Sequence, residues 1–301
     1  MGNSIQIAGS IILATIPALA WGYVFYKKNP EGKYITALIF IVGALSVFPI
    51  LLYKISWQFF PWMNAFNFAN RYTEDIIGFS SLVLLPLSVV ITFMIVGAIE
   101  EVMKMLAVRS VDKNRIKTID DSIEFFIIAA LGFSFTENIL YFYNIWVVHG
   151  ADNLVLPFLF RSSFSTFAHL LFSGILGYYY GVAHFAKPIL QEELRKGRKH
   201  NILTKLQEKF GFKKEKIFYR EKLLEGLIIA IGLHALFNIF LEMGLTFMII
   251  IFLFGGNAAL NYLFNKKENH KNYGKLYEST RNHQVSGETI PIEQTSLNTE
   301  T

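Results

Sequence analysis

The chain of 301 residues contains no cysteine. Disulfide bonds, zinc–thiolate sites and cysteine nucleophiles are therefore excluded. Charge is also scarce, since charged residues make up 17% of the chain and hydrophobic residues 53%. With a mean hydropathy of +0.39, the sequence is too apolar for a soluble domain of this length. The apolar runs lack alternation of polar and apolar residues, so helices are expected to be the elements that cross the membrane.

Basic residues are absent from the first 26 positions. A secretory signal peptide needs a basic region ahead of a short apolar core. Here Lys27 and Lys28 follow the apolar run instead. The segment is therefore interpreted as a retained first helix.

Seven apolar runs reach the length of about 20 residues that a helix needs to cross a bilayer. They cover residues 5–25, 34–53, 77–109, 122–148, a run that begins between 154 and 163 and ends near 185, 223–241 and 244–264. Lysine and arginine gather after the odd-numbered runs and are sparse after the even-numbered ones. The positive-inside rule then places the N-terminus outside and the C-terminus inside. We predict an all-α, polytopic bundle of about seven transmembrane helices.

Residues 1–264 are predicted to form the integral membrane unit, with its functional core over residues 77–241. Residues 265–301 are polar and are predicted to be a disordered cytoplasmic tail. Residues 187–222 hold 12 Lys or Arg against 5 Glu, a charge of +7 in a chain that carries +5 overall. This block is interpreted as a cytoplasmic loop beside anionic lipid. No nucleic-acid partner is expected, and the sequence leaves the oligomeric state open.

Four of the predicted spans carry ionisable or amide side chains deep inside apolar sequence. Such a group costs several kcal/mol in hydrocarbon, roughly 2.5–3.5 kcal/mol for Asp, Lys or Arg, unless it faces a partner or a wet cavity. The side chains concerned are Glu100, Glu101 and Lys104, then Glu137 and Asn138, then His169, and finally His234 and Asn238. Their number indicates one shared polar pocket. Glutamates and histidines together are suited to activating water.

Helix geometry places four of these side chains at similar depth. Counted at 1.5 Å per residue from the predicted inner helix ends, Glu100, Glu137, His169 and His234 lie roughly 14 to 24 Å deep. They therefore share a slab about 10 Å thick, whereas independent placement could scatter them over ~30 Å. We expect them to meet in the bundle.

Spacing within the helices points the same way. Glu100 and Lys104 are i,i+4 neighbours that share a face and can pair. Glu101 lies about 100° around the helix, so one glutamate can face the pocket while the other pairs with Lys104 or a neighbouring helix. The i,i+4 spacing also joins Glu137 with Tyr141 and His234 with Asn238. Lys104, Asn138 and Tyr141 are assigned pairing roles.

Four motifs carry a resemblance to a known family. They are Glu100-Glu101-Val102-Met103-Lys104, Gly132-Phe133 through Glu137-Asn138-Ile139-Leu140-Tyr141, His169, and His234-Ala235-Leu236-Phe237-Asn238. On these residues the chain resembles the PrsW-type intramembrane proteases, which are distantly similar to the type II CAAX prenyl endopeptidases. The resemblance implies cleavage of a membrane-embedded or membrane-proximal protein within the cell membrane. An anti-sigma factor is one substrate of family members.

The residues allow a metal-dependent chemistry, which the family description implies. His169 and His234, with Glu137, would bind zinc through two imidazoles and one carboxylate. Glu100 or Glu101 would then be the general base. No HExxH motif is present to decide the matter.

A metal-free chemistry is the alternative, with Glu100 and His169 activating water directly; the metal-dependent version is the favoured one. In both versions Asn238 and a histidine could donate hydrogen bonds to the oxyanion, each donor worth roughly 3–4 kcal/mol.

Two other functions are compatible with the same residues. Intramembrane Glu and His also form the proton relays of coupled transporters. Such transporters often contain inverted repeats, and here no repeat is found and seven spans do not halve. A non-catalytic membrane scaffold of the same fold is the second alternative.

Overall fold

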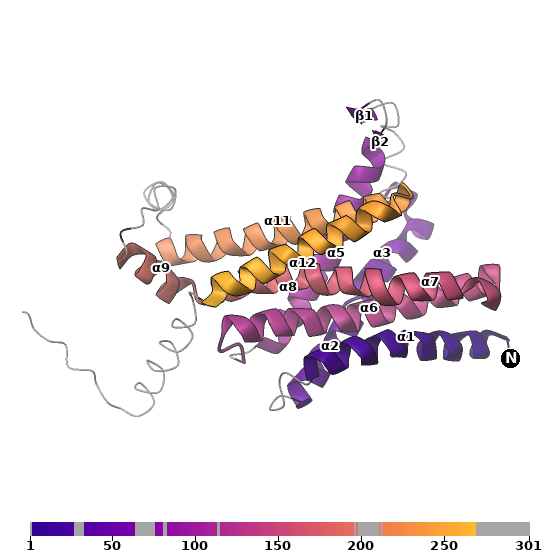
Figure 1. Cartoon of the computed structure of the whole chain (residues 1–301), viewed down its shortest axis with the longest axis horizontal. Helices are drawn as coiled ribbons and strands as arrows, with labels where there is room; N and C mark the ends of the chain where they lie inside the picture. Colours follow the sequence, from indigo (N-terminus) through magenta and orange to yellow (C-terminus); the bar gives the residue numbers. More distant parts are fainter. Residues whose placement is uncertain are drawn as a thin grey trace, which may run out of the picture.

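The computed structural model describes residues 2–26, 33–63, 76–80, 83–112, 115–195, 197, 211 and 213–268. Figure 1 shows them as a bundle of long helices from which one short hairpin projects. The long helices are α1 (Gly2–Tyr26), α2 (Lys33–Leu45), α3 (Phe48–Phe59), α5 (Leu87–Asp112), α6 (Ile119–His149), α8 (Thr166–His184), α11 (Lys214–Glu242) and α12 (Thr246–Glu268). Shorter elements are η1 (Pro61–Met63), β1 (Ile76–Ser80), β2 (Val83–Pro86), η2 (Ala151–Asn153), α7 (Val155–Phe160), the π-helical η3 (Arg161–Ser165) and α9 (Ala186–Arg195).

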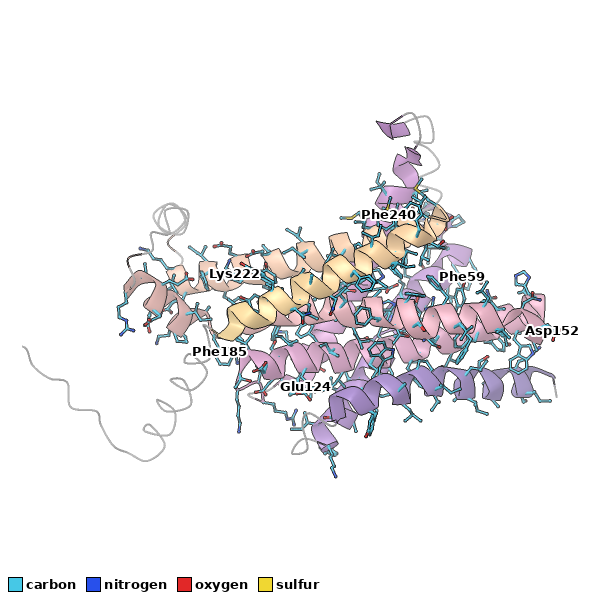
Figure 2. All side chains as sticks on the ribbon, in the orientation of Figure 1. Phe59, Glu124, Asp152, Phe185, Lys222 and Phe240 are labelled. Carbon is cyan, nitrogen blue, oxygen red and sulfur yellow. The ribbon has the colours of Figure 1, made fainter. Side chains whose placement is uncertain are left out.

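Six stretches within the described residues are long and apolar enough to cross a membrane. They are Ser4–Tyr23, Lys33–Phe59, Ile119–His149, Ala151–His184, Lys214–Glu242 and Thr246–Leu263. The remaining predicted span corresponds to α5, which is 26 residues long and carries Glu100, Glu101 and Lys104. The prediction of an all-α polytopic bundle is confirmed. Asp152 and Lys222 lie at opposite ends of it (Figure 2).

Two predicted spans differ from the structure where proline interrupts the helix. The third was expected to run helically from residue 77, but β1 and β2 form an antiparallel hairpin and α5 begins at Leu87. A helix from residue 77 would place Pro86 in its interior, where it lacks an N–H donor and clashes with the preceding turn. The second span breaks between α2 and α3, and Pro49 lies in the first turn of α3.

The C-terminal helix extends past its predicted end, and most of the basic loop lies outside the described residues. Helix α12 continues to Glu268, so residues 265–268 are helical rather than part of the tail. The rest of the predicted tail lies outside the described residues. So does most of the basic loop, apart from α9, two single glycines and the start of α11.

Helix α6 is fixed at the centre of the bundle by close backbone contacts. A Cβ atom at Gly43 of α2 would overlap the backbone of Ala129, and one at Gly132 would overlap the backbone of Phe40. On the other side of α6, a Cβ at Gly177 of α8 would lie 2.9 Å from the Cα of Ile123. Small residues at these positions allow helices to approach closely. Figure 1 shows α6 and α8 between the α1–α2 pair and the α11–α12 pair.

Candidate active site

Three side chains from three separate helices converge in the bundle interior. Glu100 of α5, His169 of α8 and His234 of α11 each offer one potential ligand atom, and these atoms all lie within 4.8 Å of one another. The three residues are 6%, 5% and 2% exposed. The structure therefore brings together the side chains that the depth argument placed in a single slab.

Both carboxylate oxygens of Glu101 have bonding partners inside the protein. One of its oxygens, Oε1, lies 2.7 Å from the Lys104 ammonium and 2.8 Å from Nδ1 of His234. The other, Oε2, accepts a hydrogen bond of 3.4 Å from the hydroxyl of Ser173. Of the two glutamates that could pair with Lys104, it is Glu101, three positions before it, that does so. The alternative, in which one glutamate pairs and the other faces the pocket, describes the arrangement.

Lys104 links this pair to His169. Its Nζ is completely buried, lies 3.1 Å from Nδ1 of His169 and sits 4.4 Å from the centre of the Phe133 ring. An ammonium can only donate, so Nδ1 of the neutral imidazole must accept and Nε2 must carry the proton. That Nε2 lies 2.9 Å from Oε2 of Glu137 and donates to it.

Glu137 has a second partner that the sequence interpretation missed. The guanidinium of Arg161 forms an ion pair with Glu137 at 2.8 Å. It also donates from Nε to Asn138 at 2.7 Å and lies 4.3 Å from the centre of the Tyr141 ring. Asn138 and Tyr141 therefore hold Arg161. The sequence interpretation assigned no role to Arg161, although an arginine among Leu, Phe and Ser, eight positions before His169, was a usable signal of a buried charge.

Glu100 differs from both other glutamates. Its Oε2 is buried and has no hydrogen-bond partner among the described residues. The nearest basic atom is Nε2 of His234, at 3.5 Å. Asn238 lies one helical turn beyond His234 and is half-buried, and its role as an oxyanion donor stays a prediction.

The donor set fits a divalent metal ion of the zinc type. Two imidazoles and one carboxylate form a common ligand set of catalytic zinc. His234 directs Nδ1 to the Glu101 carboxylate and leaves Nε2 for a ligand, which is the usual support of a metal-bound histidine. The partnerless oxygen of Glu100 is a further match. His169 would have to release either Lys104 or Glu137 to join the set. The carboxylate that lies with the two histidines is Glu100, whereas the sequence interpretation had proposed Glu137.

Comparison with known proteins gives one family and one relative. Residues 31–258, more than half of the chain, match the family described as "PrsW family intramembrane metalloprotease". The chain is 28% identical over 182 residues to "Protease PrsW" of Shouchella clausii (strain KSM-K16), which covers 58% of this chain and 71% of that protein. No solved structure matches.

Proposed function

The chain belongs to the PrsW family of intramembrane metalloproteases and is an intramembrane protease; we propose that Glu100, His169 and His234 form its hydrolytic centre. The observation that carries the proposal is the meeting of these three side chains, from three helices, within 4.8 Å. Burying them without function would be costly, since ionisable groups in a membrane interior are expensive. Membership of a protease family also favours hydrolysis over the transporter and scaffold alternatives.

Glu100 is proposed to act on the attacking water. Among the three glutamates of the cluster, it alone has a buried oxygen without a hydrogen-bond partner within the described structure. That oxygen accepts a proton from water as the water oxygen attacks the peptide carbonyl, and the proton then passes to the leaving amine. Glu101 is unsuited to this task because Lys104 and His234 already occupy its Oε1.

Water and substrate are proposed to reach the cluster past Glu137. The Glu137 side chain is 31% exposed, whereas those of Glu100 and Glu101 are 7% and 0% exposed. Tyr141 lies one turn further along α6 and is 44% exposed. Hydrolysis needs a path for water, and the exposure of Glu137 and Tyr141 supports an approach along this face of α6.

A divalent ion, with zinc as the proposed metal, would be held by Glu100, His169 and His234. When bound, it would polarise the substrate carbonyl and lower the pKa of its bound water. Glu101 would keep His234 oriented from the other ring nitrogen. Without metal, Glu100 is the carboxylate that accepts the proton of the attacking water; with metal, it would serve as a ligand instead.

The proposed substrate is a membrane-embedded or membrane-proximal protein, such as a single-span anti-sigma factor, in the cell membrane. The test reconstitutes the full chain in lipid vesicles with a single-span substrate. Glu100→Gln should reduce cleavage by about 10²–10⁴-fold, the usual contribution of a general base. The matched control is Glu242→Gln at the exposed end of α11, which should cleave at the wild-type rate. Wild-type cleavage by Glu100→Gln would remove Glu100 from the mechanism.

Metal dependence is tested by the metal content of the purified protein and by cleavage with and without chelator. Zinc chemistry predicts about one bound ion in the wild type and in Glu242→Gln, and none in His234→Ala. Chelator should then abolish cleavage, and added zinc should restore it. A metal-free preparation that cleaves at full rate in chelator would reject the zinc proposal and leave direct activation of water by Glu100.

A further inference from the structure

The segment that precedes His169 departs from α-helical geometry. Residues Arg161–Ser165 form a π-helical turn between α7 and α8. The backbone N–H of Thr166 bonds to the carbonyl of Arg161, five residues back. The indole of Trp21, from α1, donates to the carbonyl of Ser162 within this turn at 3.1 Å. The wide turn is thus stabilised by a neighbouring helix, and such turns occur frequently at functional sites.

The turn aligns Arg161 with His169. The two residues are eight positions apart, and eight α-helical steps would leave their side chains about 80° apart around the helix. A π-turn absorbs one residue, so the interval acts as seven steps and the difference falls to about 20°. Both side chains can then reach the same carboxylate. Glu137 Oε2 lies 2.8 Å from Arg161 and 2.9 Å from His169.

A buried hydrogen-bond network holds the guanidinium in place. Nε of Arg161 donates to Oδ1 of Asn138 at 2.7 Å, and Nδ2 of Asn138 donates to Thr166 Oγ1 at 3.2 Å. The Thr166 hydroxyl donates in turn to the backbone carbonyl of Arg161 at 2.9 Å. Ser134 also donates to Thr166 Oγ1, at 3.0 Å. Asn138 and Thr166 are each 1% exposed, so the network is shielded from competing water.

We infer that Arg161 is a positioning residue of the protease. It holds the Glu137 carboxylate against Nε2 of His169, and this contact, with Lys104 at Nδ1, sets the orientation and the proton position of the imidazole. Arg161 acts through Glu137 and His169 and touches no reacting atom. The inference rests on the proposed hydrolytic centre, because it assigns a function to the orientation of His169.

The experiment measures kcat and KM of the full chain in vesicles for Arg161→Gln, Arg161→Lys and Arg161→Ala. Arg161→Gln should lower kcat by about 10–100-fold, as supporting residues of catalytic ligands do, with little change in KM. Arg161→Lys should lose less, since it keeps the charge but not the planar fork. Guanidinium chloride, below denaturing concentration, should restore part of the kcat of Arg161→Ala and none of that of Glu100→Gln. Arg109→Gln, at an exposed arginine in the last turn of α5, is the matched control.

Two sets of outcomes are separable. Full cleavage by Glu100→Gln would overturn the proposed centre whatever Arg161 does. If Glu100→Gln is inactive, then an unchanged kcat in Arg161→Gln overturns the positioning role. A loss in Arg161→Ala that guanidinium does not restore, accompanied by a lower unfolding temperature, would likewise overturn it and assign Arg161 to stability alone.

Discussion

Two carboxylate–cation pairs flank His169, one at each ring nitrogen, and they lie in different surroundings. The pair of Glu101 and Lys104 lies on the Nδ1 side, and both side chains are 0% exposed. The pair of Glu137 and Arg161 lies on the Nε2 side, with the side chains 31% and 11% exposed. The same type of interaction thus occurs once sealed inside the bundle and once close to its surface.

The difference in exposure indicates that the inner pair contributes mainly to stability and the outer pair mainly to the geometry of the site. Removing one partner of a sealed pair strands a charge, which costs about 3–5 kcal/mol. In the outer pair, water can solvate the exposed part of Glu137 if Arg161 is lost. The loss then disturbs the position of the Glu137 carboxylate more than it lowers the free energy of unfolding. We therefore expect changes to the inner pair to reduce stability, and changes to the outer pair to reduce rate.

Lys104→Met should give the largest effect on stability. It leaves the Glu101 carboxylate buried with no cation, and the free energy of unfolding should fall by about 3–5 kcal/mol. Reversible unfolding in mixed micelles measures the change.

The double variant Glu101→Gln/Lys104→Met removes both charges and should recover most of that loss. Arg109→Gln serves as the control for removing a cation from α5 without burying an unpaired charge. If the single and double variants are equally unstable, the ion pair is not the source of the effect and the comparison of the two pairs fails.

Glu137→Gln should separate rate from stability. The amide keeps the shape of the side chain but loses the charge that holds Arg161 and accepts from His169, so kcat should fall by about 10–100-fold. The free energy of unfolding should change by less than in Lys104→Met, because the position is partly exposed. Steady-state cleavage and unfolding of the same preparation provide the two measurements. A stability loss as large as that of Lys104→Met would erase the distinction between the pairs.

Tyr141→Leu should have the smallest effect. It removes the ring beneath the Arg161 guanidinium, a contact worth roughly 0.5–1 kcal/mol at an exposed site. We expect a loss of kcat of a few-fold. Tyr141→Phe, which keeps the ring, should match the wild type. If Tyr141→Phe lost as much as Tyr141→Leu, the hydroxyl rather than the ring would be the important group.

The convergence of Glu100, His169 and His234 could be predicted from the sequence. Each is a costly residue in an apolar helix, and helix rise alone gives its depth. The partner of Lys104 could not be predicted from the sequence, because the residues three and four positions before it both share a helix face with it. Glu101 is selected by contacts from other helices, since His234 and Ser173 both reach its carboxylate. That choice depends on packing, which spacing along one helix does not contain.

The missed features have a common origin in the backbone. The π-turn at Arg161 depends on a hydrogen bond that shifts by one residue, and residues 161–165 carry no proline or glycine to announce it. The boundary at Leu87 did have a signal, Pro86, which the hydropathy pattern outweighed. The interpretation as an all-α polytopic bundle succeeded because length and apolarity require no knowledge of packing, and six of the predicted spans meet both criteria within the described residues.

The π-turn also relates the alignment of Arg161 and His169 to the number of residues between them. Deleting one residue from 162–164 would let the helix close into ordinary α-turns with seven steps between Arg161 and His169, so the two side chains would stay within about 20° of each other around the helix. Exchanging side chains at those three positions would preserve the spacing. Among homologous sequences, a one-residue gap between the arginine and the histidine should therefore accompany a regular α-helix that keeps the two side chains aligned, whereas a further inserted residue in a regular helix would rotate Arg161 by roughly 100°.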